Sequence, residues 1–157
     1  MKIELLVIGK TTQPFVQDGL NEFVGRIKRY VSFDMEVIPD LKKNKNLSFG
    51  EQKKKEGELI LKRLRSDDYI VLLDENGKEF SSQGFARYME NKMNTVPGRL
   101  VFVIGGPYGF STDVYTIAKE KISLSKMTFS HQLIRVIFAE QLYRAFTILN
   151  NEPYHHE

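Results

Sequence analysis

A run of apolar residues that leads directly into a glycine-rich turn is the clearest candidate for chemistry in this chain. Residues 100–104 are apolar throughout, and residues 105–109 read Gly-Gly-Pro-Tyr-Gly. An apolar run rich in β-branched types is typical of a strand buried on both faces, as in a parallel sheet. Ligands of such sheets bind at the carboxyl ends of the strands, so the turn predicts a place where backbone amides meet a ligand. A tight turn without any ligand is the alternative.

The residues around this turn exclude two common ligand classes. A P-loop for nucleoside triphosphates needs a Gly-Lys pair followed by Ser or Thr, whereas Gly109 is followed by Phe110. A dinucleotide fold needs an acidic residue at the end of the next strand to bind ribose hydroxyls, and residues 122–129 contain none. The turn therefore favours a nucleoside-like ligand that lacks a polyphosphate.

The C-terminal residues carry a second set of side chains suited to chemistry. Tyr154 and His155 lie in a short polar tail, after a helical segment that contains Arg144. Histidine exchanges protons near neutral pH, and tyrosine donates or accepts a hydrogen bond at the edge of a base. The tail therefore suits the handling of a proton on a heterocyclic ring. A frayed terminus is the alternative, and the two adjacent histidines are also compatible with a tag remnant or a chance metal site.

Strands and helices alternate along the chain, and this alternation would position both the glycine-rich turn and the C-terminal side chains. Strands are expected at residues 2–8, 33–38, 68–73 and 100–104. Helices are expected from Pro14 onward, from Ser48 to about Arg65, at residues 82–93 and at residues 131–149. The alternation predicts one α/β domain over residues 1–157 with a parallel sheet.

Two local patterns within these elements give sharper expectations. The helix that opens at Pro14 has one apolar face, which should be buried. Its members are Phe15, Leu20, Phe23, Ile27 and Tyr30. Residues 75–77 read Glu-Asn-Gly, which predicts a turn after the third strand.

The helix expected at residues 131–149 has an unusually broad apolar arc. It spans about half the circumference, more than the roughly 100° stripe of a surface helix. We expect burial on two sides, one against the core and the other against a twofold-related copy, since dimers are the commonest closed oligomers. Arg135 lies inside the arc, where a charge needs a partner or a ligand. A paired carboxylate, or a side chain that snorkels outward, is the structural alternative.

Composition excludes several classes of protein. The 157 residues include no cysteine, so a disulfide framework, a thiolate nucleophile and a thiolate zinc site are all excluded. Three histidines give poor support to a catalytic zinc, so no metal is expected. No apolar run approaches the roughly 18 residues of a membrane span, and the N-terminus continues as a strand, which predicts a cytoplasmic protein without membrane contact. The net charge of +3 is compatible with a polyanionic partner.

A basic cluster surrounds the second expected helix. Its members are Lys42, Lys43, Lys45, Lys53, Lys54, Lys55, Lys62, Arg63 and Arg65. A solvated helix face is the favoured interpretation, and contact with RNA phosphates is the functional alternative. Aromatic side chains are not visibly interleaved with these residues, so the segment gives no argument for base stacking.

Several spaced motifs together resemble the ribosomal RNA large subunit methyltransferase H family, a group of SPOUT-class methyltransferases. They read FVIGGPxG from residue 102, LSxMTFxHQLxRV from residue 124, EQxYRAF from residue 140 and EPYH from residue 152. Residues 8–10 and 55–57 extend the resemblance over essentially the whole chain. Several motifs in order are far more specific than one glycine turn.

The resemblance implies an enzyme that depends on S-adenosylmethionine and methylates N3 of a pseudouridine in the helix-69 loop of 23S rRNA. It also implies action on the assembled ribosome, a homodimer, and a C-terminal trefoil knot that nothing in the periodicity indicates. Knot-forming loops hold the cofactor in the family. They correspond here to Leu73, Gly105, Leu124, Ser125, Lys126, Met127, Thr128 and Phe129.

The implied reaction assigns tasks to the C-terminal residues. Pseudouridine N3 carries a proton. Either this proton must be removed, or the anion that its loss leaves on the base must be stabilised. We assign His155 or Tyr154 to orienting the base and assisting proton loss, and Arg144 or Arg135 to offsetting negative charge on a ring carbonyl. A ribosome-binding protein on the same scaffold, with no chemistry of its own, is the alternative from another class.

Two positions depart from the family pattern. Ser130 stands where many relatives have proline, and His156 stands where they often have lysine or arginine. Ser130 is expected to start the last helix as a capping hydroxyl. His156 is mostly uncharged at neutral pH and is expected to contact RNA phosphate less strongly than lysine.

Overall fold

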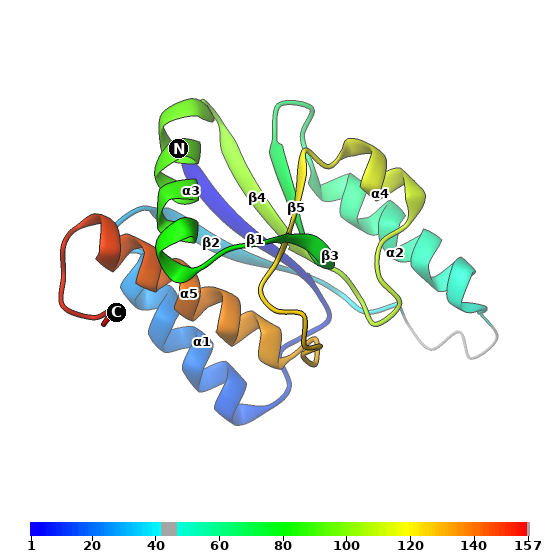
Figure 1. Ribbon diagram of the computed structural model, residues 1–157. Coiled ribbons are helices and arrows are strands. Elements are labelled where there is room, and N and C mark those ends of the chain that lie inside the picture. Colours follow the sequence, from blue (N-terminus) through cyan, green and yellow to red (C-terminus); the bar gives the residue numbers. More distant parts are fainter. Residues whose placement is uncertain (42–46, 157) are drawn as a thin grey trace.

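A five-stranded parallel sheet forms the centre of the protein in a computed structural model that describes residues 1–41 and 47–156 (Figure 1). The strand order is β2-β1-β4-β3-β5, and every neighbouring pair is parallel. The elements are β1 (Lys2–Ile8), α1 (Pro14–Ile27), β2 (Ser32–Ile38), α2 (Phe49–Arg63), β3 (Tyr69–Glu79), α3 (Ser82–Thr95), β4 (Arg99–Ile104), α4 (Thr112–Ile117), β5 (Glu120–Ser123) and α5 (Leu133–Leu149). The predicted parallel α/β fold is confirmed.

Helices cover both faces of this sheet. Figure 1 shows α1, α3 and α5 on one face and α2 with α4 on the other. Successive side chains of a strand point to opposite faces, so β4 contributes Phe102 to one core and Val103 to the other. Each residue from 100 to 104 is at most 5% exposed, as expected for a strand buried on both faces.

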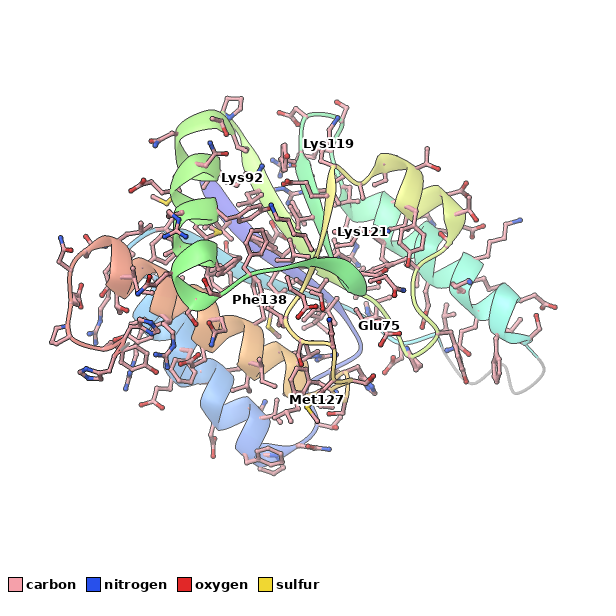
Figure 2. All side chains as sticks on the ribbon, viewed as in Figure 1. Glu75, Lys92, Lys119, Lys121, Met127 and Phe138 are labelled. Atoms are coloured by element: carbon pink, nitrogen blue, oxygen red, sulfur yellow. The ribbon has the colours of Figure 1, made fainter. Side chains whose placement is uncertain are left out.

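The broad apolar arc of α5 is covered within one chain. α5 packs between α1 and α3 over the sheet (Figure 1). Phe138 points from α5 into the core (Figure 2), and Leu142 and Phe146 are buried beside it. The residue Val136 packs against Gly19 of α1. A second copy of the chain is therefore not needed to explain the width of the arc.

Some local expectations differ from the structure. Phe15 is 66% exposed, so its predicted burial is wrong. Val16 takes the inward position instead, because it lies one turn before the buried Leu20. The last helix begins at Leu133 rather than at residue 131, and α2 ends at Arg63.

The turn expected at residues 75–77 does not end the third strand, which continues to Glu79. Leu73 and Lys78 both pair with Ile122 of β5, so the residues between them bulge out of the ladder. A Cβ atom at Gly77 would lie 2.6 Å from the backbone of Ile122, which explains why the sequence has glycine there. The Glu-Asn-Gly signal therefore marks a bulge rather than a reversal of the chain.

No helix within residues 1–41 and 47–156 is long and apolar enough to cross a membrane.

Candidate functional site

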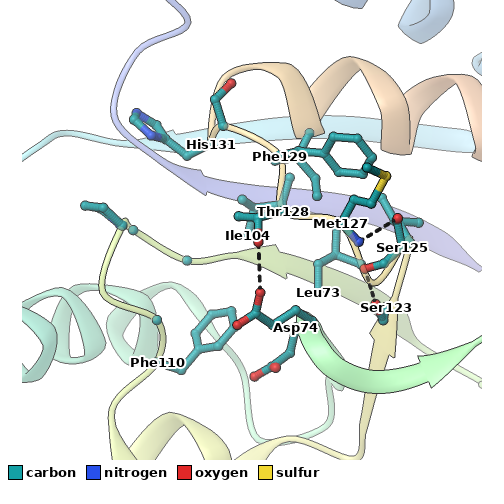
Figure 3. Close-up of a pocket in the computed structure, with 18 residues that line it drawn as sticks. Leu73, Asp74, Ile104, Phe110, Ser123, Ser125, Met127, Thr128, Phe129 and His131 are labelled. Carbon is teal, nitrogen blue, oxygen red and sulfur yellow. Dashed lines mark hydrogen bonds between the residues drawn. The ribbon is translucent and has the colours of Figure 1, made fainter.

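A pocket of about 410 Å³ lies at the carboxyl end of β4 and beside the bulge of β3 (Figure 3). Three segments line it: residues 73–75 at the start of the β3 bulge, the glycine loop of residues 105–109 with Phe110, and the segment between β5 and α5. The lining residues are Leu73, Asp74, Glu75, Ile104, Gly105, Gly106, Pro107, Gly109, Phe110, Ser123, Leu124, Ser125, Met127, Thr128, Phe129, Ser130, His131 and Ile134. This is the edge at which parallel sheets bind ligands.

The glycine loop is shaped by close approaches that only glycine allows. A Cβ atom at Gly105 would lie 2.9 Å from the ring of Phe110. A Cβ atom at Gly106 would lie 2.5 Å from a carboxylate oxygen of Glu56. The loop is closed by Gly109, whose N–H donates to the carbonyl of Gly106 at 3.2 Å. The loop backbone can therefore line the pocket with no side chain in the way.

Hydroxyl groups fix the segment between β5 and α5. Ser123 Oγ donates to the carbonyl of Ser125 at 2.8 Å, and Ser125 Oγ accepts from the backbone N–H of Met127 at 2.9 Å (Figure 3). Ser130 Oγ accepts from the N–H of Leu133 at 3.1 Å. The N-cap of α5 is Gln132, which makes no side-chain capping bond, so Ser130 fixes the turn before the helix and is not its N-cap. The wall that this segment gives the pocket is thus held by its own side chains.

The charge of the lining restricts the ligand. Among the lining residues there is no lysine or arginine, while Asp74 and Glu75 bring two carboxylates from the β3 bulge. Glu75 Oε2 accepts from Thr128 Oγ1 at 3.3 Å, and Asp74 accepts from the hydroxyl of Tyr115. Burial and the Asp74 carboxylate raise the pKa of Tyr115 to about 12, so Tyr115 remains a donor. A polyphosphate does not suit this lining, whereas a neutral or cationic ligand does.

The structure gathers seven of the eight residues assigned to the cofactor. Lys126 is the exception, because its side chain is 86% exposed and its Nζ lies 3.9 Å from Glu79 Oε1. Other lining residues were missed from the sequence, namely Asp74, Glu75, Phe110, Ser123 and His131. Ser123 ends β5, and Phe110 and His131 lie just before α4 and α5, so their place beside an element is a signal that could have marked them. Asp74 and Glu75 lie in the bulge of β3, which no local pattern shows.

Arg144, Tyr154 and His155 lie together at the other end of α5. Arg144 Nη1 is 3.0 Å from His155 Nδ1, and the Arg144 guanidinium lies 4.8 Å from the centre of the Tyr154 ring. The hydroxyl of Tyr154 donates to Glu140 Oε1 at 3.1 Å. The tail is tied down further by Glu152, which accepts from the hydroxyl of Tyr30 at 2.6 Å. The tail is therefore packed against the body of the protein.

This tail cluster (Glu140, Arg144, Tyr154 and His155) does not reach the pocket of its own chain. None of its members lines that pocket. Arg144 follows Ile134, a lining residue, by ten positions on α5, which corresponds to about 15 Å at 1.5 Å per residue. Figure 1 shows the C-terminus at the far end of α5 from the segment that precedes this helix.

Arg135 is not part of the tail cluster. It is fully buried and donates to the carbonyls of Ile8, Gly9 and His131 and to Thr11 Oγ1, at 2.8 to 3.0 Å. These bonds occupy most of the five N–H groups of a guanidinium. They favour a role in holding the end of β1 against the start of α5.

Glu56 is a buried carboxyl group beneath the glycine loop. It is 4% exposed, and its Oε1 has no hydrogen-bond partner among the residues that the structure describes. Its other oxygen accepts only a long bond of 3.5 Å from Gln52. Burial raises the pKa of Glu56, and the nearby Asp40 charge raises it further. The charged form is therefore disfavoured in the folded protein.

Replacement of Glu56 by glutamine is expected to stabilise the protein at neutral pH by about 1 kcal/mol, because it removes a buried charge whose oxygen is unpaired. The raised pKa means that the folded state binds a proton more readily than the unfolded state, so wild-type stability falls as pH rises through this window. The advantage of Glu56→Gln should vanish below the ordinary glutamate pKa of about 4.3. Urea unfolding at neutral pH and at a pH below the glutamate pKa measures the free energy of unfolding of wild type and variant, and the exposed Glu58→Gln is the control. If Glu56→Gln stabilised the protein equally at both pH values, Glu56 would not be the buried carboxyl group with a raised pKa.

No group of three or more histidine, cysteine, aspartate or glutamate side chains suited to a metal ion occurs in the described part of the chain.

Comparison with known proteins gives one consistent result. A family model described as "Predicted SPOUT methyltransferase" matches residues 1–155. The chain is 66% identical to the ribosomal RNA large subunit methyltransferase H of Parabacteroides distasonis and 64% identical to that of Bacteroides thetaiotaomicron, with 100% of each chain covered. Identity to the same protein of Christiangramia forsetii is 58%, over 99% of both chains.

A solved structure supports the same fold. The structure of a probable methylase family protein from Haemophilus influenzae covers 95% of this chain and 66% of that chain, with a TM-score of 0.52 and 13% identity. At this identity the likeness concerns the fold alone. With the family model and the full-length relatives, it leads to one assignment. The chain belongs to the SPOUT methyltransferases, and within them to the family of ribosomal RNA large subunit methyltransferase H.

Proposed function

We propose that the protein transfers a methyl group from S-adenosylmethionine to 23S rRNA. One observation carries the proposal: the glycine-loop pocket contains carboxylates and no lysine or arginine, in a chain whose full-length relatives are named large subunit rRNA methyltransferases. S-adenosylmethionine carries a sulfonium and an ammonium and has no phosphate, so its charge complements such a pocket.

The pocket residues fit the two parts of this cofactor. Apolar side chains such as Leu73, Ile104 and Leu124 suit the adenine ring, and the carboxylates of Asp74 and Glu75 suit hydroxyl or cationic groups. Backbone groups of Gly105, Ser125, Met127, Thr128 and Phe129 complete the proposed binding set, from which Lys126 is left out because it does not line the pocket. The sulfonium of the bound cofactor supplies the methyl group.

We propose N3 of a pseudouridine in the helix-69 loop as the acceptor. The nitrogen carries a proton, and the tail cluster holds the groups that can handle it. Burial and Glu140 raise the pKa of Tyr154, so its hydroxyl stays protonated. Its one O–H donates to Glu140, and its oxygen orients the base by accepting a hydrogen bond. His155 Nδ1, which accepts from Arg144, becomes the proton acceptor when the base displaces that bond, and Arg144 then offsets negative charge on a ring carbonyl.

A homodimer belongs to the same proposal. The tail cluster lies about 15 Å along α5 from the pocket, so a second copy is the natural source of the tail that completes each site. Large apolar side chains are exposed at the start of α1, at the start of α5 and in the segment before α5, where Figure 2 shows Met127. Met127 is 77% exposed, Phe15 66% and Leu133 36%. They are the proposed contact with the partner.

The double variant Phe15→Glu, Leu133→Glu is expected to be monomeric, because two charges would be buried in the proposed interface. Sedimentation at micromolar concentration should give twice 18.2 kDa for the wild type and 18.2 kDa for the variant. Met93→Glu, at a residue 39% exposed on α3, is the control and should remain dimeric. A wild-type monomer would refute the dimer.

The trefoil knot and the location are part of the proposal as well. The segment between β5 and α5 lines the pocket together with the β3 bulge and the glycine loop, and it corresponds to the knot-forming loops of the family. Since ribosomes are the proposed substrate, we place the protein in the cytoplasm.

The decisive experiment uses ribosomes from cells that lack the enzyme. Incubation with labelled S-adenosylmethionine should label 23S rRNA at one pseudouridine, located by mapping the modified nucleotide. Calorimetry with the cofactor separates this from a binding protein without chemistry, which would show ribosome binding and no cofactor binding.

A further inference from the structure

Two exposed aromatic side chains stack on each other beside the glycine loop. The rings of Phe49 and Tyr108 have centroids 4.2 Å apart and an angle of 22° between their planes. Phe49 is 67% exposed and Tyr108 39% exposed. Each ring uses one face on the other, and most of the Phe49 surface remains in contact with water. We call this pair the aromatic platform.

Both rings stand on well-fixed backbone. Tyr108 lies between Pro107 and Gly109, two residues that line the pocket, so the platform is attached to the pocket rim. Phe49 is the first residue of α2, directly after Ser48, whose Oγ accepts from the N–H of Glu51 at 3.2 Å. The capped helix start and the closed glycine turn hold the rings in a preformed arrangement.

Positive charge accompanies the platform. Lys53 lies one turn after Phe49 on α2, and residues three or four apart share one side of a helix. Lys54 and Lys55 follow and are exposed. In the described part of the chain none of these three lysines forms an ion pair, so their charges are available to a polyanion. Lys42, Lys43 and Lys45 of the same basic cluster lie outside the described residues.

We infer that the aromatic platform of Phe49 and Tyr108 stacks an unpaired nucleobase of the RNA substrate while Lys53 to Lys55 meet its phosphates. This rests on the proposed function. Single-stranded RNA is recognised by aromatic rings that stack on bases beside a basic surface, and the fold brings both features to the rim of the pocket. Stacking could not be argued from the basic segment alone, because the second ring, that of Tyr108, comes from the glycine loop.

A tryptophan at position 49 provides a direct probe, because the chain has none of its own. Phe49→Trp is titrated with a single-stranded oligouridylate and, separately, with heparin, a polyanion without bases. Saturable quenching of the tryptophan emission by the oligonucleotide, and none by heparin, is expected from stacking. Binding of the oligonucleotide, detected by anisotropy, without quenching would overturn the inference.

Affinity variants test the energetic importance of the platform. Phe49→Leu keeps apolar bulk and removes the aromatic face, and stacking of one base contributes about 1–3 kcal/mol, so RNA affinity should fall roughly 5- to 150-fold. Binding of S-adenosylmethionine should stay at the wild-type value. Met93→Ala, at an exposed apolar residue of α3, is the matched control and should bind RNA normally.

The outcomes separate this inference from the proposed function. If the wild type methylates 23S rRNA and Phe49→Leu binds RNA as tightly as the wild type, the platform does not stack bases. That result would leave an apolar contact with a ribosomal protein as the explanation of the exposed pair. A wild type that binds single-stranded RNA through Phe49 but does not methylate 23S rRNA on ribosomes from cells that lack the enzyme would overturn the proposed function and retain the platform.

Discussion

Replacement of Gly105 by valine is expected to abolish binding of S-adenosylmethionine while the protein remains folded. A Cβ atom at Gly105 would lie 2.9 Å from Phe110 Cε1 and 3.2 Å from two further atoms of that ring. Phe110 itself lines the pocket, so a displaced ring fills space that the ligand needs. Overpacking of this kind costs about 1–3 kcal/mol of stability, less than the 5–15 kcal/mol of a typical domain. The protein should therefore remain folded. For the cofactor we expect at least about a 100-fold loss of affinity, which corresponds to about 2.8 kcal/mol of binding free energy at 1.4 kcal/mol for each tenfold change.

A valine elsewhere near the same strand provides the control. Gly98 precedes β4, and a Cβ atom there would come no closer than 3.8 Å to other atoms. Gly98→Val should bind the cofactor like the wild type. Calorimetry gives the affinities, and circular dichroism confirms that both variants are folded. Undiminished affinity of Gly105→Val would remove the glycine loop from the cofactor site.

The sheet and the place of the pocket could be predicted because they depend on local patterns. Residues 100–104 are apolar without interruption, which is sufficient to indicate a strand buried on both faces, and Gly105 with Gly106 marks the turn at its end. The carboxylates of Asp74 and Glu75 could not be placed in the same way. They reach the pocket because Leu73 and Lys78 both pair with Ile122, and the register of two distant strands is not visible in a local pattern.

Long-range contacts explain the other differences. The charge of Arg135 suggested a ligand or an ion pair, but carbonyls at the end of β1 accept its hydrogen bonds, and they are more than 120 residues away in the chain. A frayed end was the alternative interpretation of the polar tail, but Glu152 accepts a hydrogen bond from Tyr30 of a distant segment. Phe49 and Tyr108 meet in the same way. No residue spacing carries such information.

Deletion of residues 154–157 is expected to leave binding of S-adenosylmethionine intact and to reduce methylation by about 10²- to 10⁴-fold, the usual contribution of positioned acid and base groups. The deleted Tyr154 and His155 contact Glu140 and Arg144, and none of these lines the cofactor pocket. Calorimetry and initial rates on ribosomes measure the two functions separately. Methylation at the wild-type rate by the truncated protein would show that the tail has no catalytic task.

Single substitutions of Tyr154 and His155 show how much of the loss of methylation comes from each side chain. Tyr154→Phe keeps the ring that packs on Tyr143 with centroids 4.7 Å apart and loses only the hydroxyl bound to Glu140. A modest fall in turnover with unchanged pH dependence is expected, because Tyr154 remains protonated near neutral pH. His155→Ala should lower turnover further, because it removes the proposed proton acceptor. The exposed His156→Ala is the control.

Mixed dimers decide which subunit supplies the tail. One subunit carries Gly105→Val and keeps its tail, and the other keeps its pocket and lacks residues 154–157. If the tail completes the pocket of the partner, the truncated subunit's pocket receives the intact tail, and one of the two sites in each mixed dimer is restored. Random mixing makes half of the dimers mixed, so about one quarter of the wild-type activity should return. If the tail serves the pocket of its own chain, every site in the mixture has one defect, and no activity returns. The separation of about 15 Å along α5 between Arg144 and the pocket favours the first result.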